Sequence, residues 1–266
     1  NDECELLKVL VKAGADVDKA RTDFGTTPCM AAAKQRHWKV VQALIKAGAN
    51  VNTTRTDDGI TACFIAAHDG HTDMVRALVA AGADVNMPRT DVGATPCFIA
   101  AQNGHVGVVR ALIEAGADAD MPRTDDGTTP TFIAAQNGHV EVVRALIEAG
   151  ADVDKAKPEH GITPCYIAAQ NGHVKVVRAL IEAGADVDKA RTDVGTTPSM
   201  IAARHQKWDA LKALMKAGAD LKFRPRPVED RPRVQTPTPA GELRVGVPAP
   251  APAARARRGS AWALRK

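Results

Sequence analysis

The segment GATPCFIAAQNGHVGVVRALIEAGADAD, residues 93–120, contains the start and stop signals of two short helices. Thr95 is a favoured N-cap residue, and Pro96 follows at the first helical position, where its missing N–H costs no hydrogen bond. Gly104 ends this helix, because glycine accepts the left-handed conformation of a helix C-cap. The first part of the segment therefore predicts a helix of about two turns, closed at both ends.

A second helix is expected directly after it. Val109, Leu112 and Ile113 lie on one stripe of that helix, and Gly116 ends it. The following residues, 117–127, are rich in turn formers and finish on an Asp-Gly pair, which is a strong hairpin signal. The sequence predicts a unit made of a helix, a tight loop, a second helix and a hairpin-like finger.

This unit recurs with a constant period. The glycines that end the second helices are spaced 34 residues apart, at Gly14, Gly48, Gly82, Gly116, Gly150, Gly184 and Gly218. Units 83–116 and 117–150 differ at only six of 34 positions. The period predicts a half unit and six full units, namely 1–14, 15–48, 49–82, 83–116, 117–150, 151–184 and 185–218. A regular repeat of this length is typical of a solenoid, in which each unit buries its apolar faces against its neighbours.

The unit resembles the ankyrin repeat, whose pattern includes T-P-L-H-x-A-A, G-H, V-V and L-L-x-x-G-A-D. The resemblance covers residues 1–220 and implies an all-α repeat solenoid of stacked helix-turn-helix units with β-hairpin-like fingers. It also implies a curved stack whose fingers and first helices line a concave face. The usual ankyrin length is 33, and the extra residue of this unit falls in the finger. The family's leucine and histidine after Thr-Pro are here mostly cysteine and an aromatic residue or methionine.

The two ends of the chain differ from the middle. The half unit 1–14 has no first helix, so further repeats or a cap are expected upstream of Asn1. In the sixth unit HQKWDAL replaces the usual NGHVxVV, which predicts a more polar terminal cap. Residues 221–266 contain 11 basic and 3 acidic residues and half of the 16 prolines, which is the composition of a disordered basic tail. Residues 1–220 contain 24 basic and 28 acidic residues, so the repeats themselves are acidic.

The recurring cysteine and histidine do not fit a shared metal or catalytic site. Two ligands of one zinc ion lie within about 5 Å of each other, whereas eight helical residues separate Cys97 from His105 by roughly 12 Å. Equivalent helices pack about 8–10 Å apart, too far for Cys63 and Cys97 to share a metal or a disulfide. We expect the cysteines to fill core slots, the histidines to bind loop backbone, and the chain to use no metal, cofactor or catalytic residue.

A partner is expected to contact positions that the stacking does not use. The first set is the finger motif R-T-D, whose central members are Arg55, Asp57, Arg89, Asp91, Arg123 and Asp125. The alternative is that arginine and aspartate of neighbouring fingers pair with each other and stiffen the array. On the second helices, Arg110 and Glu114 are expected to form an i, i+4 pair on a solvated face.

The second set lies on the first helices. It comprises an aromatic row that could reach the concave face and a row of amides at the helix ends, namely Phe64, Phe98, Phe132, Tyr166, Gln102, Gln136 and Gln170. Burial of the rings beneath the fingers is the alternative.

These observations favour a non-enzymatic module or scaffold that binds another protein through the concave face and the fingers. One alternative is a tethering protein whose tail alone holds nucleic acid or an anionic membrane. Another is the regulatory segment of a larger enzyme or channel. We expect a monomer, and the five cysteines without disulfide spacing favour an intracellular, cytoplasmic location.

Overall fold

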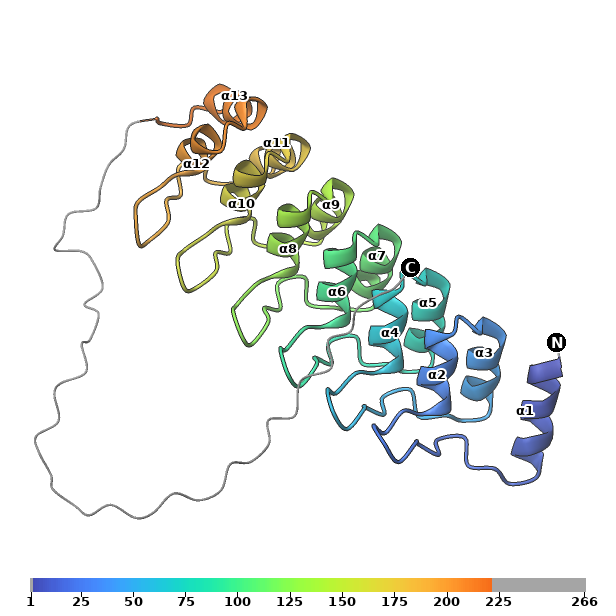
Figure 1. Cartoon of the computed structure of the whole chain (residues 1–266). Helices are drawn as coiled ribbons and strands as arrows, with labels where there is room; N and C mark the ends of the chain where they lie inside the picture. Colours follow the sequence, from blue (N-terminus) through green and yellow to red (C-terminus); the bar gives the residue numbers. More distant parts are fainter. Residues whose placement is uncertain (1, 222–266) are drawn as a thin grey trace, which may run out of the picture. The chain divides into compact units, whose positions relative to one another are not determined.

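The computed structural model describes residues 2–221, and within them the chain forms thirteen α-helices (Figure 1). The first helices of the six full units are α2 (Pro28–Lys34), α4 (Ala62–His68), α6 (Pro96–Asn103), α8 (Pro130–Asn137), α10 (Pro164–Asn171) and α12 (Pro198–Arg204). The second helices, including that of the half unit, are α1 (Asp2–Lys12), α3 (Trp38–Lys46), α5 (Thr72–Ala80), α7 (Val106–Glu114), α9 (Val140–Glu148), α11 (Val174–Glu182) and α13 (Trp208–Lys216). The predicted tail lies outside the described residues beyond Leu221.

The helices form two layers. Each first helix packs on the first helices of the neighbouring units, and each second helix does the same in its own layer. The fingers extend beyond the layer of first helices (Figure 1). This arrangement confirms the predicted all-α repeat solenoid.

The fingers are hairpin-like turns. In the fourth unit the Arg123 N–H donates to the Thr128 carbonyl at 2.9 Å, and the Gly127 N–H donates to the Arg123 carbonyl at 3.0 Å. Among the described residues the only bridge between extended residues joins Lys157 to Ile162. Each finger is therefore closed by local backbone hydrogen bonds and adds no strand.

The helix ends follow the sequence signals. Thr95 Oγ1 accepts the Phe98 N–H at 3.1 Å, and Gly104 closes α6 with a φ of 78°. In the second unit Thr61 caps α4 in the same way, although alanine replaces the proline that follows it elsewhere. The threonine side chain is thus sufficient to start the helix.

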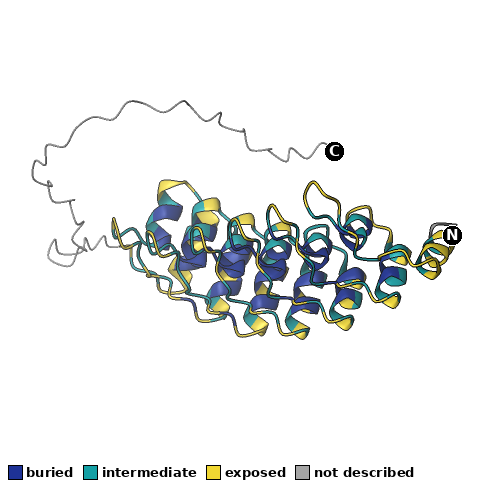
Figure 2. Cartoon of the chain, turned by 90° about the horizontal axis from the view of Figure 1, so that it is seen from below, coloured by how far each residue is buried: buried dark blue, intermediate teal, exposed yellow. Residues whose placement is uncertain are grey.

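The core lies between the two layers (Figure 2). One leucine from the second helix of every full unit is at most 1% exposed, and these are Leu44, Leu78, Leu112, Leu146, Leu180 and Leu214. Ala100 and Ala101 are fully buried, and their small side chains allow the close helix contacts that this core needs. Cys97 is also buried, and burial raises the pKa of its thiol to about 12. The cysteine therefore acts as a small hydrophobic residue, as predicted.

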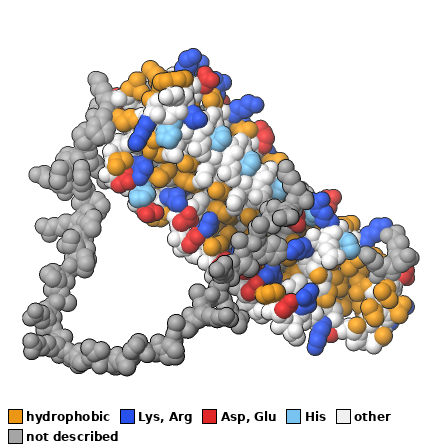
Figure 3. Space-filling view, viewed as in Figure 1, with side chains coloured by type: hydrophobic (Ala, Val, Ile, Leu, Met, Phe, Trp, Pro, Cys, Tyr) orange, Lys and Arg blue, Asp and Glu red, His pale blue; other side chains and the backbone are white. Residues whose placement is uncertain are grey.

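The histidines join consecutive units. His105 Nε2 lies 3.0 Å from the carbonyl oxygen of His68, which ends the first helix of the preceding unit. His139 and His173 make the same contact with Gln102 and Gln136. A row of histidine side chains is visible along the stacked units (Figure 3). The histidines do bind backbone, but the acceptor belongs to the preceding unit and not to the histidine's own loop.

The end units depart from this pattern. Arg36 and Gln206 occupy the loop position that is glycine in the central units, and both have a positive φ, of 62° and 57°. Trp208 of α13 is 58% exposed and Met215 is 48% exposed, so the expectation of a polar outer cap is wrong for these two side chains. On α1, Leu6 is 60% exposed because the half unit has no first helix to cover it.

Replacing Arg36 with glycine should stabilise the protein. A non-glycine residue in the left-handed region costs about 1 kcal/mol, and the side chain of His71 next to Arg36 has a buried Nε2 with no hydrogen-bond partner. We expect Arg36→Gly to raise the denaturant midpoint by more than Gln206→Gly does, because no further histidine packs on residue 206. A lower midpoint for Arg36→Gly would contradict this account.

Candidate functional site

The finger arginines pair within their own finger. Arg89 Nη2 lies 2.5 Å from Asp91 Oδ2, and its Nε donates to Asp91 Oδ1 at 3.0 Å. Arg123 and Asp125 form the same close ion pair. The alternative interpretation, in which these arginines pair with the aspartates of neighbouring fingers, is therefore wrong for the main contact, because a spacing of two residues brings the partners together in one turn.

Each inner finger places its cation over an aromatic ring of the preceding unit. The Arg89 guanidinium carbon lies 5.8 Å from the centre of the Phe64 ring, and that of Arg123 lies 5.5 Å from the Phe98 ring. The remaining contacts of this kind are Arg55 over Phe24, Lys157 over Phe132 and Arg191 over Tyr166. These distances are within the range of a cation–π interaction.

The four rings predicted as a possible contact row are buried. Their exposed fractions are 1–4%, for Phe64, Phe98, Phe132 and Tyr166. The expectation that they reach the concave surface is wrong, and the alternative, burial beneath the fingers, holds. Each ring is buried because the next finger's cation and the neighbouring core residues cover it. The rings join units and offer no exposed face to a partner.

Backbone hydrogen bonds also run from finger to finger. The Thr90 N–H donates to the Asp58 carbonyl at 2.9 Å, and the Thr124 N–H donates to the Val92 carbonyl at 3.1 Å. In the fifth finger this position is Pro158, which has no N–H to donate. Here the junction is made by Lys157 Nζ, which lies 2.8 Å from Asp126 Oδ2 of the fourth finger.

This ion pair changes the acidity of its carboxyl group. Burial alone would raise the pKa of Asp126, but hydrogen bonds from Lys157 and Thr128 outweigh burial and hold the pKa below its ordinary value. Asp126 therefore stabilises the fourth and fifth fingers in its charged form.

A further set of contacts between units was missed by the sequence reasoning. The Asn52 carboxamide oxygen accepts the Asp84 N–H at 2.7 Å, and Asn86 accepts the Asp118 N–H at 2.8 Å. The same bond recurs with Asp18, Asp120, Asp154 and Asp188 as acceptors, so it joins each full unit to the next and the sixth unit to Asp220. The sequence did contain a signal for these bonds, because an Asp or Asn recurs two residues after the last residue of every G-A-[DN] tripeptide but the final one, as Asn86 does after Asp84.

The second helices pair across units and not along one helix. Arg110 Nη1 donates to Glu148 Oε2 of the next unit at 2.8 Å, where the sequence predicted Glu114 of the same helix. Arg76 with Glu114 and Arg144 with Glu182 follow the same pattern. The prediction was wrong because stacking brings the next helix within reach of a long arginine side chain.

Three rows of side chains remain accessible beside the fingers and first helices. The finger carboxylates Asp57, Asp91 and Asp125 are exposed, and Gln102, Gln136 and Gln170 at the helix ends are half-buried. Between them, the residue after each buried ring is a half-buried isoleucine, namely Ile65, Ile99, Ile133 and Ile167. We call these three rows the finger-side surface.

The isoleucine row was not predicted. Ile99 and Gln102 are three residues apart and share one side of α6, whereas Phe98 turns under the finger. Periodicity alone could not decide which of two adjacent apolar residues, Phe98 or Ile99, faces the core. Acidic and basic side chains lie next to each other along the fingers (Figure 3).

Residues 2–221 meet the requirements of neither a metal site nor a membrane-spanning helix. In residues 2–221, no three His, Cys, Asp or Glu side chains lie together in a way that could hold a metal ion. No helix in that range has the length and apolar character needed to cross a bilayer.

Removing a finger arginine that covers a ring should destabilise the array. Arg123→Ala removes a cation–π contact and a short ion pair, and we expect a loss of about 1–2 kcal/mol. Arg21→Ala is the matched control, because Arg21 forms the same pair with Asp23 but is largely exposed and no ring within the described residues lies beneath it. Urea unfolding followed by circular dichroism measures both variants. Equal losses for Arg123→Ala and Arg21→Ala would contradict a contribution from the ring.

The Asp126 contact predicts a pH-dependent stability. Because the pKa of Asp126 is lower in the folded state, its stabilisation is complete above the ordinary carboxyl pKa of about 4 and is lost as the pH falls below it. We expect Asp126→Asn to lower the unfolding midpoint at pH 7 and to have a progressively smaller effect as the pH falls from 4 towards 2. Lys157→Gln should weaken this dependence, since Lys157 is the main partner that lowers the pKa. A difference that stays constant between pH 7 and pH 2 would show that charge is not involved.

Comparison with known proteins places the chain in a family. A family model described as "Ankyrin repeats (3 copies)" matches residues 1–89, 86–157 and 154–224. Among solved structures, the ankyrin repeat domain of human ASB11 is 31% identical to this chain, with a TM-score of 0.66. The match covers 76% of this chain and 88% of that domain. No protein with a curated description matches the chain.

The period, the capped helix pairs, the stacked layers and the family model agree with one another. The chain belongs to the ankyrin-repeat family.

Proposed function

We propose that this protein is a scaffold that binds a partner protein through the finger-side surface. Ankyrin repeats are in general modules of protein–protein interaction, and the family is typically non-enzymatic. The observation that carries the proposal is that, within each unit, some side chains contact the neighbouring unit and others remain accessible. The finger arginines, aromatic rings and histidines are used in stacking, whereas the carboxylates, isoleucines and glutamine side chains remain accessible.

The chemistry of this surface indicates what kind of partner fits. Asp91 and Asp125 are exposed beside the finger arginines with which they pair, and residues 1–220 carry four more acidic than basic residues, so the net charge of the repeats favours basic side chains. Half-buried isoleucines such as Ile99 and Ile133 offer apolar contact, and the neighbouring amides can donate and accept hydrogen bonds. The partner is therefore a protein segment with apolar residues flanked by lysine or arginine.

The arginines are a poor choice for testing this surface. Glutamates in place of Arg89 and Arg123 would reverse the charge of two fingers and so change the candidate surface directly. Both arginines cover buried rings, so their replacement changes stability as well as the surface. Gln102 and Gln136 are better sites, because within residues 2–221 their contacts with the next unit are made by their backbone carbonyls, which a substitution leaves in place.

A photo-crosslinking amino acid at position 136 should identify the partner, and its affinity can then be measured with purified proteins. We expect Gln102→Arg combined with Gln136→Arg to weaken binding at least tenfold with an unchanged melting temperature, because two cations are added to a surface that attracts cations. Glu141→Arg is the matched control, since it makes the same total change in charge on the exposed side of α9. Crosslinks from position 141 and equal losses for both variants would refute binding at the finger-side surface.

A further inference from the structure

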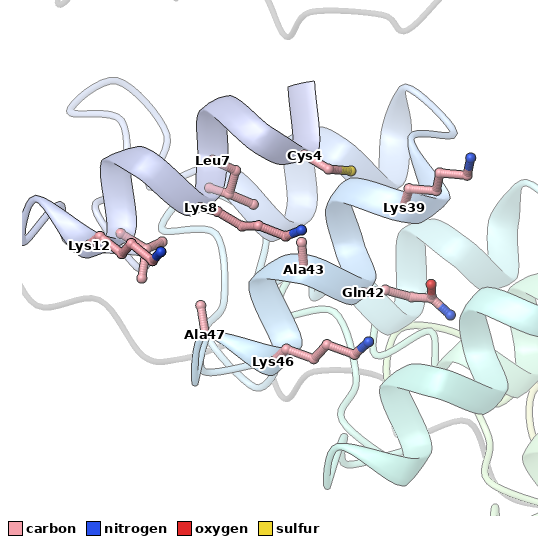
Figure 4. Close-up of a pocket in the computed structure, with 10 residues that line it drawn as sticks. Cys4, Leu7, Lys8, Lys12, Lys39, Gln42, Ala43, Lys46 and Ala47 are labelled. Carbon is pink, nitrogen blue, oxygen red and sulfur yellow. The ribbon is translucent and has the colours of Figure 1, made fainter. Parts of the chain in front are cut away.

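A groove separates the first two helices of the second layer. It has a volume of about 370 Å³ and lies between α1 and α3 (Figure 4). Both are second helices, whereas the fingers extend beyond the layer of first helices (Figure 1). Its floor is apolar and is formed by Leu7 and Val11 of α1 with Ala43 of α3 and Ala47, the residue that follows α3. All four side chains are half-buried, so the floor remains accessible.

The rim of this groove is basic. Lys8 and Lys12 of α1 and Lys39 and Lys46 of α3 surround the floor, and Gln42 lies between the two lysines of α3 (Figure 4). All four lysines are exposed. Lys8 also pairs with Glu5 on its own helix, at 2.7 Å. The groove is therefore a basic site on a repeat region that carries four more acidic than basic residues.

The α1–α3 junction lacks the Arg–Glu pair that joins second helices in the central units. At three junctions of the second layer, an arginine pairs with a glutamate that lies 38 residues further along, as in Arg110 with Glu148. At the α1–α3 junction the corresponding residues are Lys8 and Lys46, which are both cations, as are Arg178 and Lys216 at the α11–α13 junction; the groove described above lies at the α1–α3 junction. The position that holds the acceptor carboxylate in the central units is thus a second lysine. An external carboxylate would complete the pattern here.

We propose that the groove between α1 and α3 binds an acidic amphipathic helix of a partner protein. The floor residues are four apart on each wall, Leu7 with Val11 and Ala43 with Ala47, which is one helical turn. A partner helix with apolar residues at i and i+4 matches that spacing, and glutamates on both sides of its apolar stripe reach the lysines of both walls. The small side chains of Ala43 and Ala47 allow a close approach. This site is separate from the finger-side surface and does not depend on the function proposed for it.

Occupancy of the groove can be followed through the reactivity of one cysteine. Cys4 lines it and is half-buried, whereas Cys29, Cys63, Cys97 and Cys165 are buried. Burial raises the pKa of the Cys97 thiol to about 12, which keeps it in the unreactive form. A thiol reagent applied to the folded protein therefore modifies Cys4 first. A helix bound in the groove should slow this reaction.

The probe is a fluorescent synthetic peptide of about four helical turns, with leucine pairs at i and i+4 along one face and glutamates on both flanks. Its binding to the full chain is followed by anisotropy, and a scrambled peptide of the same composition is the control for net charge. We expect saturable binding of the amphipathic peptide, slower modification of Cys4, and weaker binding at higher salt.

Two matched variants assign the site. Lys46→Glu places a carboxylate opposite Lys8, and Lys216→Glu places one opposite Arg178 in the same repeat register at the other end of the layer. Both variants remove the same charge, so attraction of the peptide to the basic residues of 221–266 is affected equally. We expect Lys46→Glu to weaken peptide binding at least tenfold and Lys216→Glu to leave it unchanged. Ala43→Leu, which fills the floor without changing charge, should also weaken binding.

Several results would overturn the proposal. Equal losses for Lys46→Glu and Lys216→Glu, or equal binding of the scrambled peptide, would show unspecific attraction. Unchanged Cys4 modification would place the peptide elsewhere. Vesicles containing phosphatidylserine that bind through Lys46 when the peptide does not would assign the groove to a membrane surface. None of these results affects the test of the finger-side surface, which uses substitutions at Gln102 and Gln136.

Discussion

The structure depends on one constraint, which is that a single unit cannot bury its own apolar faces. A pair of helices as short as α6 and α7 has too little surface to form a core, and it becomes stable only when neighbouring units cover it. The polar contacts obey the same constraint. The histidine bonds, the cations over aromatic rings, the Asp and Asn bonds and the Arg–Glu pairs all join one unit to the next.

This use of side chains in stacking determines what is left for binding. Arginine at a finger tip would be a good contact residue on most proteins, but Arg123 is committed to a ring below it and an aspartate beside it. Side chains without such a partner in the neighbouring unit remain accessible, and they lie in rows because the units repeat. At the α1–α3 junction two lysines stand in place of the Arg–Glu pair, at the rim of an apolar groove.

Much of the fold could be predicted from the residues of one unit. Thr95, Pro96 and Gly104 act within a few residues of themselves, so their roles as helix start and stop signals need no knowledge of the neighbours. The contacts of Phe98 and Arg110 could not be predicted in this way. Their partners, Arg123 and Glu148, are one unit away, and the rotation between units decides which side chains meet. The finger-side surface was therefore predicted only in part, with the carboxylates and amides identified and the isoleucines missed.

Because of Pro158, the contact between the fourth and fifth fingers depends on ionic strength more than the contacts between the other fingers do. Elsewhere the fingers are joined by a backbone amide and a carbonyl, as in Thr90 with Asp58, and such a bond hardly changes with dissolved ions. Between the fourth and fifth fingers, the bond from Lys157 to Asp126 joins two charged groups at the surface, which mobile ions screen. Ionic strength therefore weakens this bond more than the backbone bonds between the other fingers, and it also screens the Arg–Glu pairs of the second layer. High salt therefore loosens the contact between the fourth and fifth fingers, while the helix packing and the hydrogen bonds between the same two units hold them together.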